Sequence, residues 1–162
     1  MEDKPKIYIE ASVVSYLVAR PSKDPMTSFR QVITEDWWYE ELPKLDGQIS
    51  RYVIEEATRG DAKLAQKRLA FLDEFNCLNY IPQIDQLANL YLKETGLPEK
   101  CRLDCQHMAT ASIYGIKYFA SWNCKHIVNG VIIDKIQIVN DALGISTPNI
   151  RTPEELYGVD HA

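Results

Sequence analysis

The stretch "RLDCQHMATASIYGIKYFASW", residues 102–122, sets the fold class because it places a helix and a buried strand in direct succession. Its first part carries small and apolar residues at helical spacing and reaches Gly115, a residue type that often ends helices. The run "IKYFASW" that follows is the clearest buried strand in the sequence. A helix that leads into a buried strand is part of a βαβ unit, so this stretch favours a parallel sheet covered by helices.

The same alternation of helix and strand continues on both sides of this stretch. Short apolar runs predict strands at residues 6–9, 47–50, 78–82, 116–122 and 149–151. Apolar residues at helical spacing predict helices at 11–20, 27–42, 51–60, 61–75, 84–96, 102–115 and 126–144. Neither internal repeats nor Gly/Ser linkers interrupt the pattern. We therefore predict one domain over residues 1–162, a three-layer α/β/α sandwich around a short parallel sheet.

Composition excludes several classes of protein. The chain has 162 residues and no run near the ~18 consecutive apolar residues that a membrane span needs, so we expect no membrane partner. The start "MEDKPKIYIEA" has acidic residues at once and lacks the plan of a secretory signal, which predicts a cytoplasmic protein. The net charge of -5 argues against a broadly basic coat for nucleic acid.

A local basic patch remains compatible with this charge. Arg59, Lys63 and Lys67 stand at i, i+4 and i+8, the spacing of one helix face. Such a face is either solvated or a weak RNA-binding track, and the spacing does not decide between the two.

The four cysteines are expected to be reduced thiols, because no export signal accompanies them. A zinc site is the alternative, built from Cys101, Cys105, His107, Cys124 and His126. On a helix, however, His107 lies about 200° around the axis from Cys105. The sequence therefore disfavours zinc.

Polar residues gather where the predicted strands end. Glu10 follows the first strand, Glu55 and Glu56 lie one turn past the second, and Asn123 follows the strand of the opening stretch. Asp104 lies in the first turn of the helix before that strand, on a face that is otherwise small and apolar. Because ligands bind at the carboxyl ends of parallel strands, we expect these side chains to converge on one site.

Glu10 stands out in this group, since glutamate neither caps helices nor turns the chain well. Each of the other acids has an ordinary explanation as a helix-end or surface residue. Together, however, the carboxylates lack Lys or Arg at the same positions and repel one another unless a cation joins them. Hard oxygen ligands point to Mg²⁺ or Mn²⁺.

These residues lie in motifs that resemble the PIN-domain nucleases, and specifically the VapC-like toxins of type II toxin-antitoxin pairs. The resemblance runs from "IYIEASVVSYL" through "ISRYVIEEATRGD" and "RLDCQHMATASIYGIKYFASWNCKHI" to "TPEELYG". Its most specific segment is D-x-x-H-x-A-x-A, which begins at Asp104 and precedes the buried strand. The resemblance implies a PIN-like fold with three or four acids around a divalent ion.

The resemblance assigns four positions of an acidic site, namely Glu10, Glu56, Asp104 and Asn123. Glu55 is a near alternative for the second position, Ser12 takes the hydroxyl position beside the first, and His126 would approach the scissile phosphate. The family usually has aspartate at the first and fourth positions, so Glu10 and Asn123 depart from its pattern. The remaining carboxylates, Glu10, Glu56 and Asp104, are then expected to hold one Mg²⁺ or Mn²⁺ rather than two.

Activity and partners follow from the same resemblance. It implies an endoribonuclease that hydrolyses RNA phosphodiester bonds, an antitoxin partner and a homodimer. The stripe at Phe29, Ile33 and Trp37 is either part of the core or the groove that receives the antitoxin. The alternative function is a non-catalytic PIN-like binding module, and a receiver-type phosphoryl-transfer domain is disfavoured because its phosphate-binding lysine has no counterpart.

Overall fold

A five-stranded parallel sheet organises the computed structural model, which describes residues 3–159. Its strands are β1 (Lys6–Ile9), β2 (Asp46–Ser50), β3 (Asn76–Leu78), β4 (Tyr118–Ala120) and β5 (Asn149–Arg151). They lie in the order β3-β2-β1-β4-β5, and every neighbouring pair is parallel. The predicted parallel sheet is thus confirmed, with β1 at its centre.

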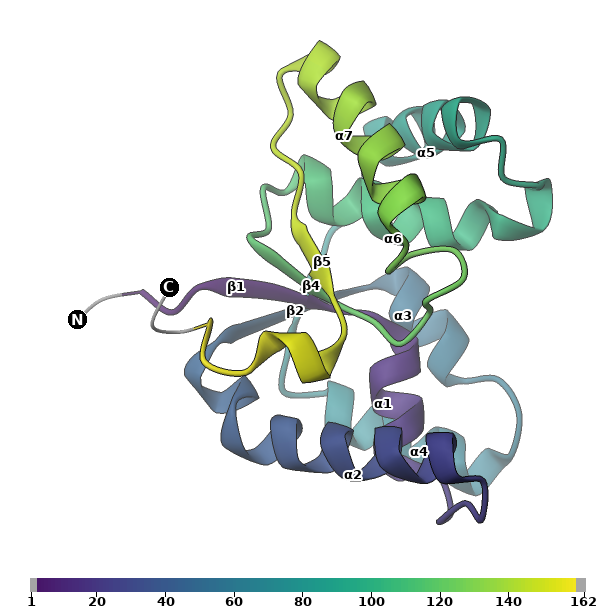
Figure 1. Cartoon of the computed structure of the whole chain (residues 1–162), viewed down its shortest axis with the longest axis vertical. Helices are drawn as coiled ribbons and strands as arrows, with labels where there is room; N and C mark the ends of the chain where they lie inside the picture. Colours follow the sequence, from purple (N-terminus) through teal and green to yellow (C-terminus); the bar gives the residue numbers. More distant parts are fainter. Residues whose placement is uncertain (1–2, 160–162) are drawn as a thin grey trace.

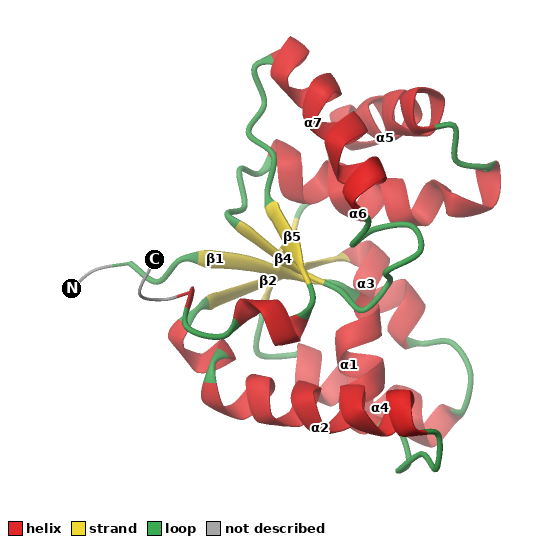
Figure 2. Ribbon diagram, in the orientation of Figure 1, coloured by secondary structure: helices red, strands yellow, loops and turns green. Residues whose placement is uncertain are grey.

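Helices cover both faces of this sheet, as predicted for a three-layer sandwich. They are α1 (Ala11–Val18), α2 (Pro25–Glu40), α3 (Arg51–Ala57), α4 (Ala62–Leu72), α5 (Pro82–Thr95), α6 (Arg102–Ile113) and α7 (Gly130–Leu143). Short 3₁₀ turns are η1 (Leu42–Lys44), η2 (Glu99–Cys101) and η3 (Pro153–Leu156). Figure 1 shows α1, α2 and α4 on one face and α5, α6 and α7 on the other, and Figure 2 shows the strands between them. None of the described helices is long and apolar enough to cross a membrane.

The central strand is buried on both faces, as expected for a sheet between two helical layers. Ile7, Tyr8 and Ile9 point to alternate sides, and each is 0% exposed. At the start of β2, Gly47 leaves room for the ring of Phe75: a Cβ there would lie 2.3 Å from the ring. Close packing therefore specifies glycine at this position.

Several predicted boundaries were wrong, and in three of them the residues at a helix start explain the difference. The strand expected at 78–82 is Asn76–Leu78, since Pro82 already starts α5. The helix expected at 126–144 begins at Gly130, because the Asn129 side chain accepts hydrogen bonds from the first backbone N–H groups. The helix expected at 27–42 begins at Pro25, capped by Asp24.

Candidate active site

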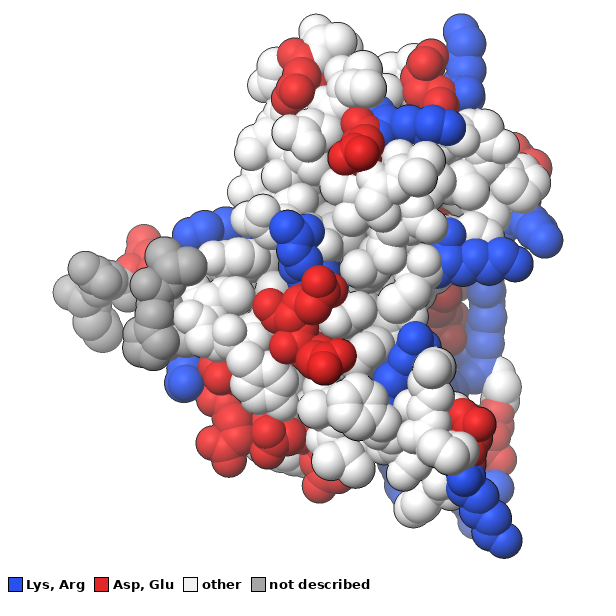
Figure 3. Space-filling model, in the orientation of Figure 1, with Lys and Arg blue, Asp and Glu red and all other residues white. Residues whose placement is uncertain are grey.

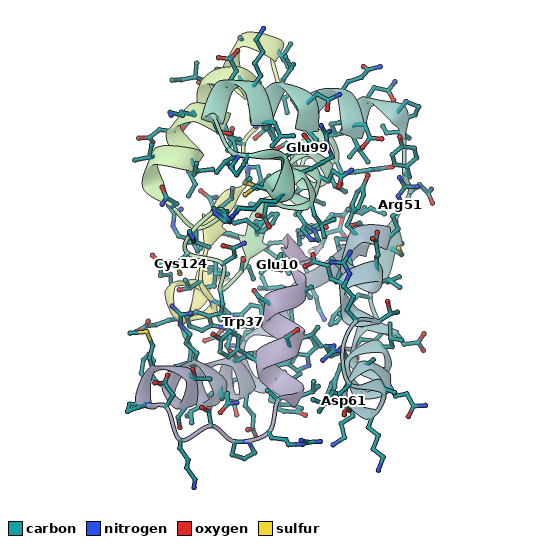
Figure 4. All side chains as sticks on the ribbon, turned by 90° about the vertical axis from the view of Figure 1, so that its right-hand side faces the viewer. Glu10, Trp37, Arg51, Asp61, Glu99 and Cys124 are labelled. Carbon is teal, nitrogen blue, oxygen red and sulfur yellow. The ribbon has the colours of Figure 1, made fainter. Side chains whose placement is uncertain are left out.

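The carboxyl ends of β1, β2 and β4 bring four of the predicted site residues to one edge of the sheet. Glu10 follows β1, Glu56 lies on α3 directly after β2, Asp104 is in the first turn of α6, and Asn123 follows β4. Figure 4 faces this edge, with Glu10 near the middle of the view between the two helical layers. The contacts below divide the residues into three groups.

Glu10 is the cap of α1, contrary to the expectation that it does not cap. Its Oε2 accepts a hydrogen bond from the backbone N–H of Ser12 at 2.8 Å. Its Oε1 accepts from the hydroxyls of Ser12 and Ser121, each at 2.6 Å. The stem, one methylene longer than that of aspartate, lets one carboxylate reach its own helix and the end of β4. Glu10 is 4% exposed, so these bonds compensate the burial of its carboxylate.

Glu56 belongs to a chain of buried hydrogen bonds that runs back into the sheet. Its Oε1 contacts Nε2 of His107, whose Nδ1 lies 2.6 Å from the Tyr8 hydroxyl. That hydroxyl lies 2.7 Å from Ser50 Oγ, which accepts from the backbone N–H of Tyr52. His107 and Tyr8 are both 0% exposed. The chain therefore fixes the position of Glu56 from inside the core.

An ionised Glu56 only accepts, so the His107 nitrogen that faces it carries a proton. With a neutral His107 the other protons follow: Tyr8 donates to His107 Nδ1, and the Ser50 hydroxyl, which accepts from the Tyr52 N–H, donates to Tyr8. The proton of His107 then lies on Nε2 and points at Glu56. Burial raises the pKa of Tyr8 well above its ordinary value, followed by smaller effects that include the charges of Glu10 and Glu56. Tyr8 thus keeps the proton that it donates.

Asp104 contacts Asn123 and His126 at the edge of the site. The Asn123 amide donates to Asp104 Oδ1 at 3.2 Å, and His126 Nδ1 lies 3.4 Å from Asp104 Oδ2. The backbone N–H of His126 donates to the oxygen of Asn123 at 3.0 Å, which fixes the orientation of the amide. The oxygen of Asn123 is therefore bound to the backbone, and its NH₂ group faces the carboxylate.

The pKa of Asp104 is raised above its ordinary value. Burial is the largest cause, and the charges of Glu10 and Glu56 add to it, while His107 and His126 oppose it. Among the described residues no Lys or Arg forms an ion pair with these three carboxylates. A divalent cation fits a donor set that is acidic, partly buried and without a Lys or Arg partner.

The possible ligand atoms fall into two clusters. In each cluster, one ligand atom from each of three residues lies within 4.8 Å of the other two. The first cluster consists of Glu10, Glu56 and His107, and the second of Cys101, Asp104 and His126. The predicted trio of Glu10, Glu56 and Asp104 therefore spans both clusters.

Glu55, the alternative for the second position, points away from the site. It is exposed and pairs with Arg59 at 3.1 Å. The structure therefore brings Glu56, and not Glu55, next to His107.

The basic residues do not share a helix face, so that expectation was wrong. Gly60 has a positive φ of 82°, and Asp61 caps a new helix, so Arg59 precedes α4 while Lys63 and Lys67 lie on it. Figure 4 marks this break at Asp61, well below Arg51 in the view.

A different set of cations lines a single pocket. A pocket of about 620 Å³ lies between α3 and the start of α6, and its basic residues are Arg51, Arg59, Lys100 and Arg102. The same two helices carry Glu56 and Asp104. Elsewhere the charges are mixed: Figure 3 shows acidic and basic side chains interspersed on the face of Figure 1. Glu56 and Asp104 do not line this pocket, and the carboxylate that does is Glu55. The positive charge therefore gathers on the two helices that also carry site carboxylates.

The stripe on α2 is divided between core and surface. Trp37 is 0% exposed and belongs to the core, whereas Phe29 is 49% exposed and Ile33 is half-buried. Phe29 and its exposed neighbours Met26 and Val32 leave an apolar surface on this helix.

Sequence reasoning missed the residues that hold the acids in place: Tyr8, Ser50, His107 and Ser121. Ser50 ends β2 and Ser121 directly follows β4, so the rule that singled out Glu10 and Asn123 could also have found these two serines. No pattern in the sequence indicates that the hydroxyl of Tyr8, on a strand, forms a hydrogen bond with His107, on a helix 99 residues away.

Two solved structures have a similar fold. The chain is 14% identical to a chain of VapBC-1 from nontypeable Haemophilus influenzae, with a TM-score of 0.54 and coverage of 92% of this chain and 98% of that one. It is 12% identical to a chain of VapBC2 from Rickettsia felis, solved bound to a DNA fragment from their promoter, with a TM-score of 0.50 and coverage of 91% and 98%.

No family model matches the chain, and neither does any curated protein. At 12% and 14% identity the structural likeness establishes the fold, which is the PIN-like fold of VapC-type proteins. The prediction of a PIN-like α/β/α sandwich is thus confirmed.

Proposed function

We propose that the chain is a metal-dependent endoribonuclease of the VapC-like toxin type. The observation that supports this most is the convergence of Glu10, Glu56 and Asp104 from three elements of a PIN-like fold, without a Lys or Arg ion-pair partner among the described residues. Burial first, and then the charges of Glu10 and Glu56, raise the pKa of Asp104. Carboxylates that repel one another in this way fit a site completed by a cation.

Glu10, Glu56 and Asp104 would hold one Mg²⁺ or Mn²⁺. When bound, such an ion lowers the pKa of a water and offsets charge on the phosphate. The chain's own groups position the ligands: Ser12 and Ser121 hold Glu10 through their hydroxyls, and His107 holds Glu56.

Asn123 serves Asp104 as a donor. Its NH₂ group steadies the Asp104 carboxylate without adding a fourth negative charge. His126, half-buried beside Asp104, stands where a phosphate oxygen could approach.

The substrate we propose is single-stranded or looped RNA. A recessed acidic site needs a backbone that can be splayed toward it, which a duplex does not offer. Arg51, Arg59, Lys100 and Arg102 would bind phosphates away from the scissile bond, because their pocket lies between the helices that carry Glu56 and Asp104. Among the described residues Arg51 and Lys100 form no ion pair, so both are available to an anion.

Cleavage of a mixed single-stranded RNA pool under single-turnover conditions tests the proposal. The wild type should cleave with Mg²⁺ or Mn²⁺ and stop when a chelator is added. Asp104→Asn should lose this activity, whereas Asp134→Asn, the same change on an exposed residue of α7, should keep it. Cleavage that persists in Asp104→Asn contradicts the assignment.

The alternative is a non-catalytic PIN-like binding module, and one observation favours it. The carboxylate of Glu10 already accepts three hydrogen bonds, and Glu10 is 4% exposed. Its charge is thus compensated without an ion. Calorimetry separates the two functions: a module binds neither Mg²⁺ nor Mn²⁺ and cleaves no RNA, while the nuclease binds the ion even without RNA.

We further propose that residues 1–162 act as one PIN-like domain with an antitoxin partner, and that two copies form a homodimer. The exposed apolar residues of α2, Met26, Phe29 and Val32, are the surface we assign to the antitoxin. Size-exclusion chromatography with light scattering, with and without the product of the neighbouring reading frame, measures both associations. A monomer that gains no partner refutes them.

A further inference from the structure

A second cluster of ligands lies beside the acids and has a different chemistry. Atoms of Cys101, Asp104 and His126 lie within 4.8 Å of one another. A thiol, a carboxylate and an imidazole are the donors of zinc sites, whereas Mg²⁺ prefers oxygen alone. We propose that Cys101, Asp104 and His126 form a binding site for Zn²⁺, with water in the fourth position.

Local structure explains why these three residues meet. Cys101 ends η2 and Asp104 lies three residues later in the first turn of α6, so both side chains project from one face of the chain. His126 comes from the loop after β4, whose residue Asn123 accepts a hydrogen bond from the His126 backbone N–H. The site therefore has two rigid ligands and a third that is tied to the neighbouring strand.

The spacing of the atoms agrees with a tetrahedral ion. Zn–N and Zn–O bonds of about 2.0 Å in tetrahedral geometry separate nitrogen from oxygen by roughly 3.3 Å. The observed separation between His126 Nδ1 and Asp104 Oδ2 is 3.4 Å. In such a site Sγ lies roughly 3.6 Å from the nitrogen, and the 4.8 Å within which the three ligand atoms of the cluster lie is only about 1 Å longer.

A second observation is the condition of the Cys101 thiol. Cys101 is 1% exposed, and within residues 3–159 its sulfur has no hydrogen-bond partner although it lies beside a carboxylate and an imidazole. A cysteine that only packs in the core behaves as a small apolar residue and does not require a carboxylate and an imidazole beside its sulfur. On binding, a Zn–S bond forms, and the thiol proton is released to solvent.

The cluster also differs from the zinc set that the sequence suggests. Cys105, His107 and Cys124 do not join Cys101 and His126 in it. His107 instead bonds to Glu56 and Tyr8 through both ring nitrogens, and Cys124 is exposed. Asp104, which was not part of that set, supplies the third ligand.

Zinc at this site would inhibit the nuclease, a consequence that rests on the proposed function. Asp104 is shared by the two sites, and a carboxylate bound to Zn²⁺ is no longer free to hold Mg²⁺. His126 would be withdrawn from the phosphate as well. Zinc binding itself is independent of any activity toward RNA.

Co²⁺ substitution tests the site directly, because a Co²⁺–thiolate bond gives a charge-transfer absorption that carboxylate and imidazole ligands do not give. Metal-free wild type titrated with Co²⁺ should show this band at one equivalent, and Zn²⁺ should remove it. Cys101→Ser should lose the band, whereas Cys105→Ser and Cys124→Ser should keep it. His126→Ala, a change at a partly exposed residue, should weaken Zn²⁺ binding by more than about tenfold, the loss typical of removing even an outer partner of a metal ligand.

Two outcomes overturn the site: no charge-transfer band in the wild type, or a band that survives in Cys101→Ser. Inhibition has its own readout, the Zn²⁺ concentration that halves the rate of RNA cleavage in Mg²⁺. That concentration should rise by more than about tenfold in Cys101→Ser relative to Cys105→Ser. An equal concentration in both variants, despite the band in the wild type, refutes inhibition and leaves binding established. If no RNA is cleaved at all, the proposed function fails, and the Co²⁺ titration still decides the site.

Discussion

Removing one hydroxyl from the core should disturb both the stability of the fold and the position of Glu56. The change is Tyr8→Phe, which keeps the ring and deletes the oxygen that lies 2.7 Å from Ser50 Oγ and 2.6 Å from His107 Nδ1. Both partners are buried, so neither can turn to water instead. His107 then loses the donor that holds its proton on the nitrogen facing Glu56.

The size of the effect follows from the two partners left behind. A buried polar group without a partner costs about 1–3 kcal/mol. Ser50 keeps its bond to the Tyr52 N–H, so its share lies at the low end, and we expect a total loss of about 2–4 kcal/mol in the free energy of unfolding. Urea unfolding measures it, and an unchanged m-value shows that the folded and unfolded states keep their exposed surface.

Tyr91→Phe is the matched control. The Tyr91 hydroxyl is also buried and also has two partners, Ser112 and Asn140, but it lies away from the carboxylates. Both variants should lose comparable stability, while only Tyr8→Phe should lower the rate of RNA cleavage by folded protein. A stability loss below about 0.5 kcal/mol in Tyr8→Phe, the range of a surface change, would falsify the hydrogen-bond chain.

Three further changes test other parts of the structure. Gly47→Ala should lower the free energy of unfolding by about 1–3 kcal/mol, measured in urea, because the added Cβ meets the Phe75 ring; unchanged stability contradicts that packing. Burial raises the pKa of Asp104, so ionisation of this residue disfavours the folded state. Asp104→Asn should therefore be more stable than the wild type near neutral pH. This difference in stability should shrink as the pH falls through the raised pKa toward the ordinary value, and thermal unfolding across that pH range measures it. Burial also raises the pKa of the Cys105 thiol to about 12, so iodoacetamide should modify exposed Cys124 first, as peptide mass spectrometry would show; equal rates contradict the burial.

Most of the fold could be predicted from the spacing of apolar residues. A strand buried on both faces appears in the sequence as a short apolar run, and the helices on either side of it appear as segments with helical spacing. The stretch 102–122 contained a helix, its glycine stop and β4 in the expected order. The predicted ends of helices were wrong where a single side chain determines where the helix begins. Asn129 accepts two backbone hydrogen bonds and starts α7 four residues later than the apolar period suggests.

The elements that carry the candidate site were predictable, and the contacts within it were not. Polar residues at the ends of parallel strands meet at one edge whatever their role, so Glu10, Glu56, Asp104 and Asn123 could be chosen from the sequence alone. Which atom faces which depends on rotamers and on partners far along the chain. The bond from the Ser121 hydroxyl to Glu10 joins residues 111 positions apart, and no local pattern encodes it.

The two departures from the usual acids have a common physical effect, which is to replace repulsion by hydrogen bonds. With aspartate in place of Asn123, Asp104 would face a third neighbouring carboxylate where it now accepts a bond of 3.2 Å. The longer stem of Glu10 reaches Ser12 and Ser121, so its charge is compensated without a cation. The metal-free site therefore has less repulsion between carboxylates than it would with aspartate at positions 10 and 123, and an arriving ion relieves correspondingly less. Burial, and after it the charges of Glu10 and Glu56, still raise the pKa of Asp104, so a cation at this edge would stabilise the ionised form of that residue.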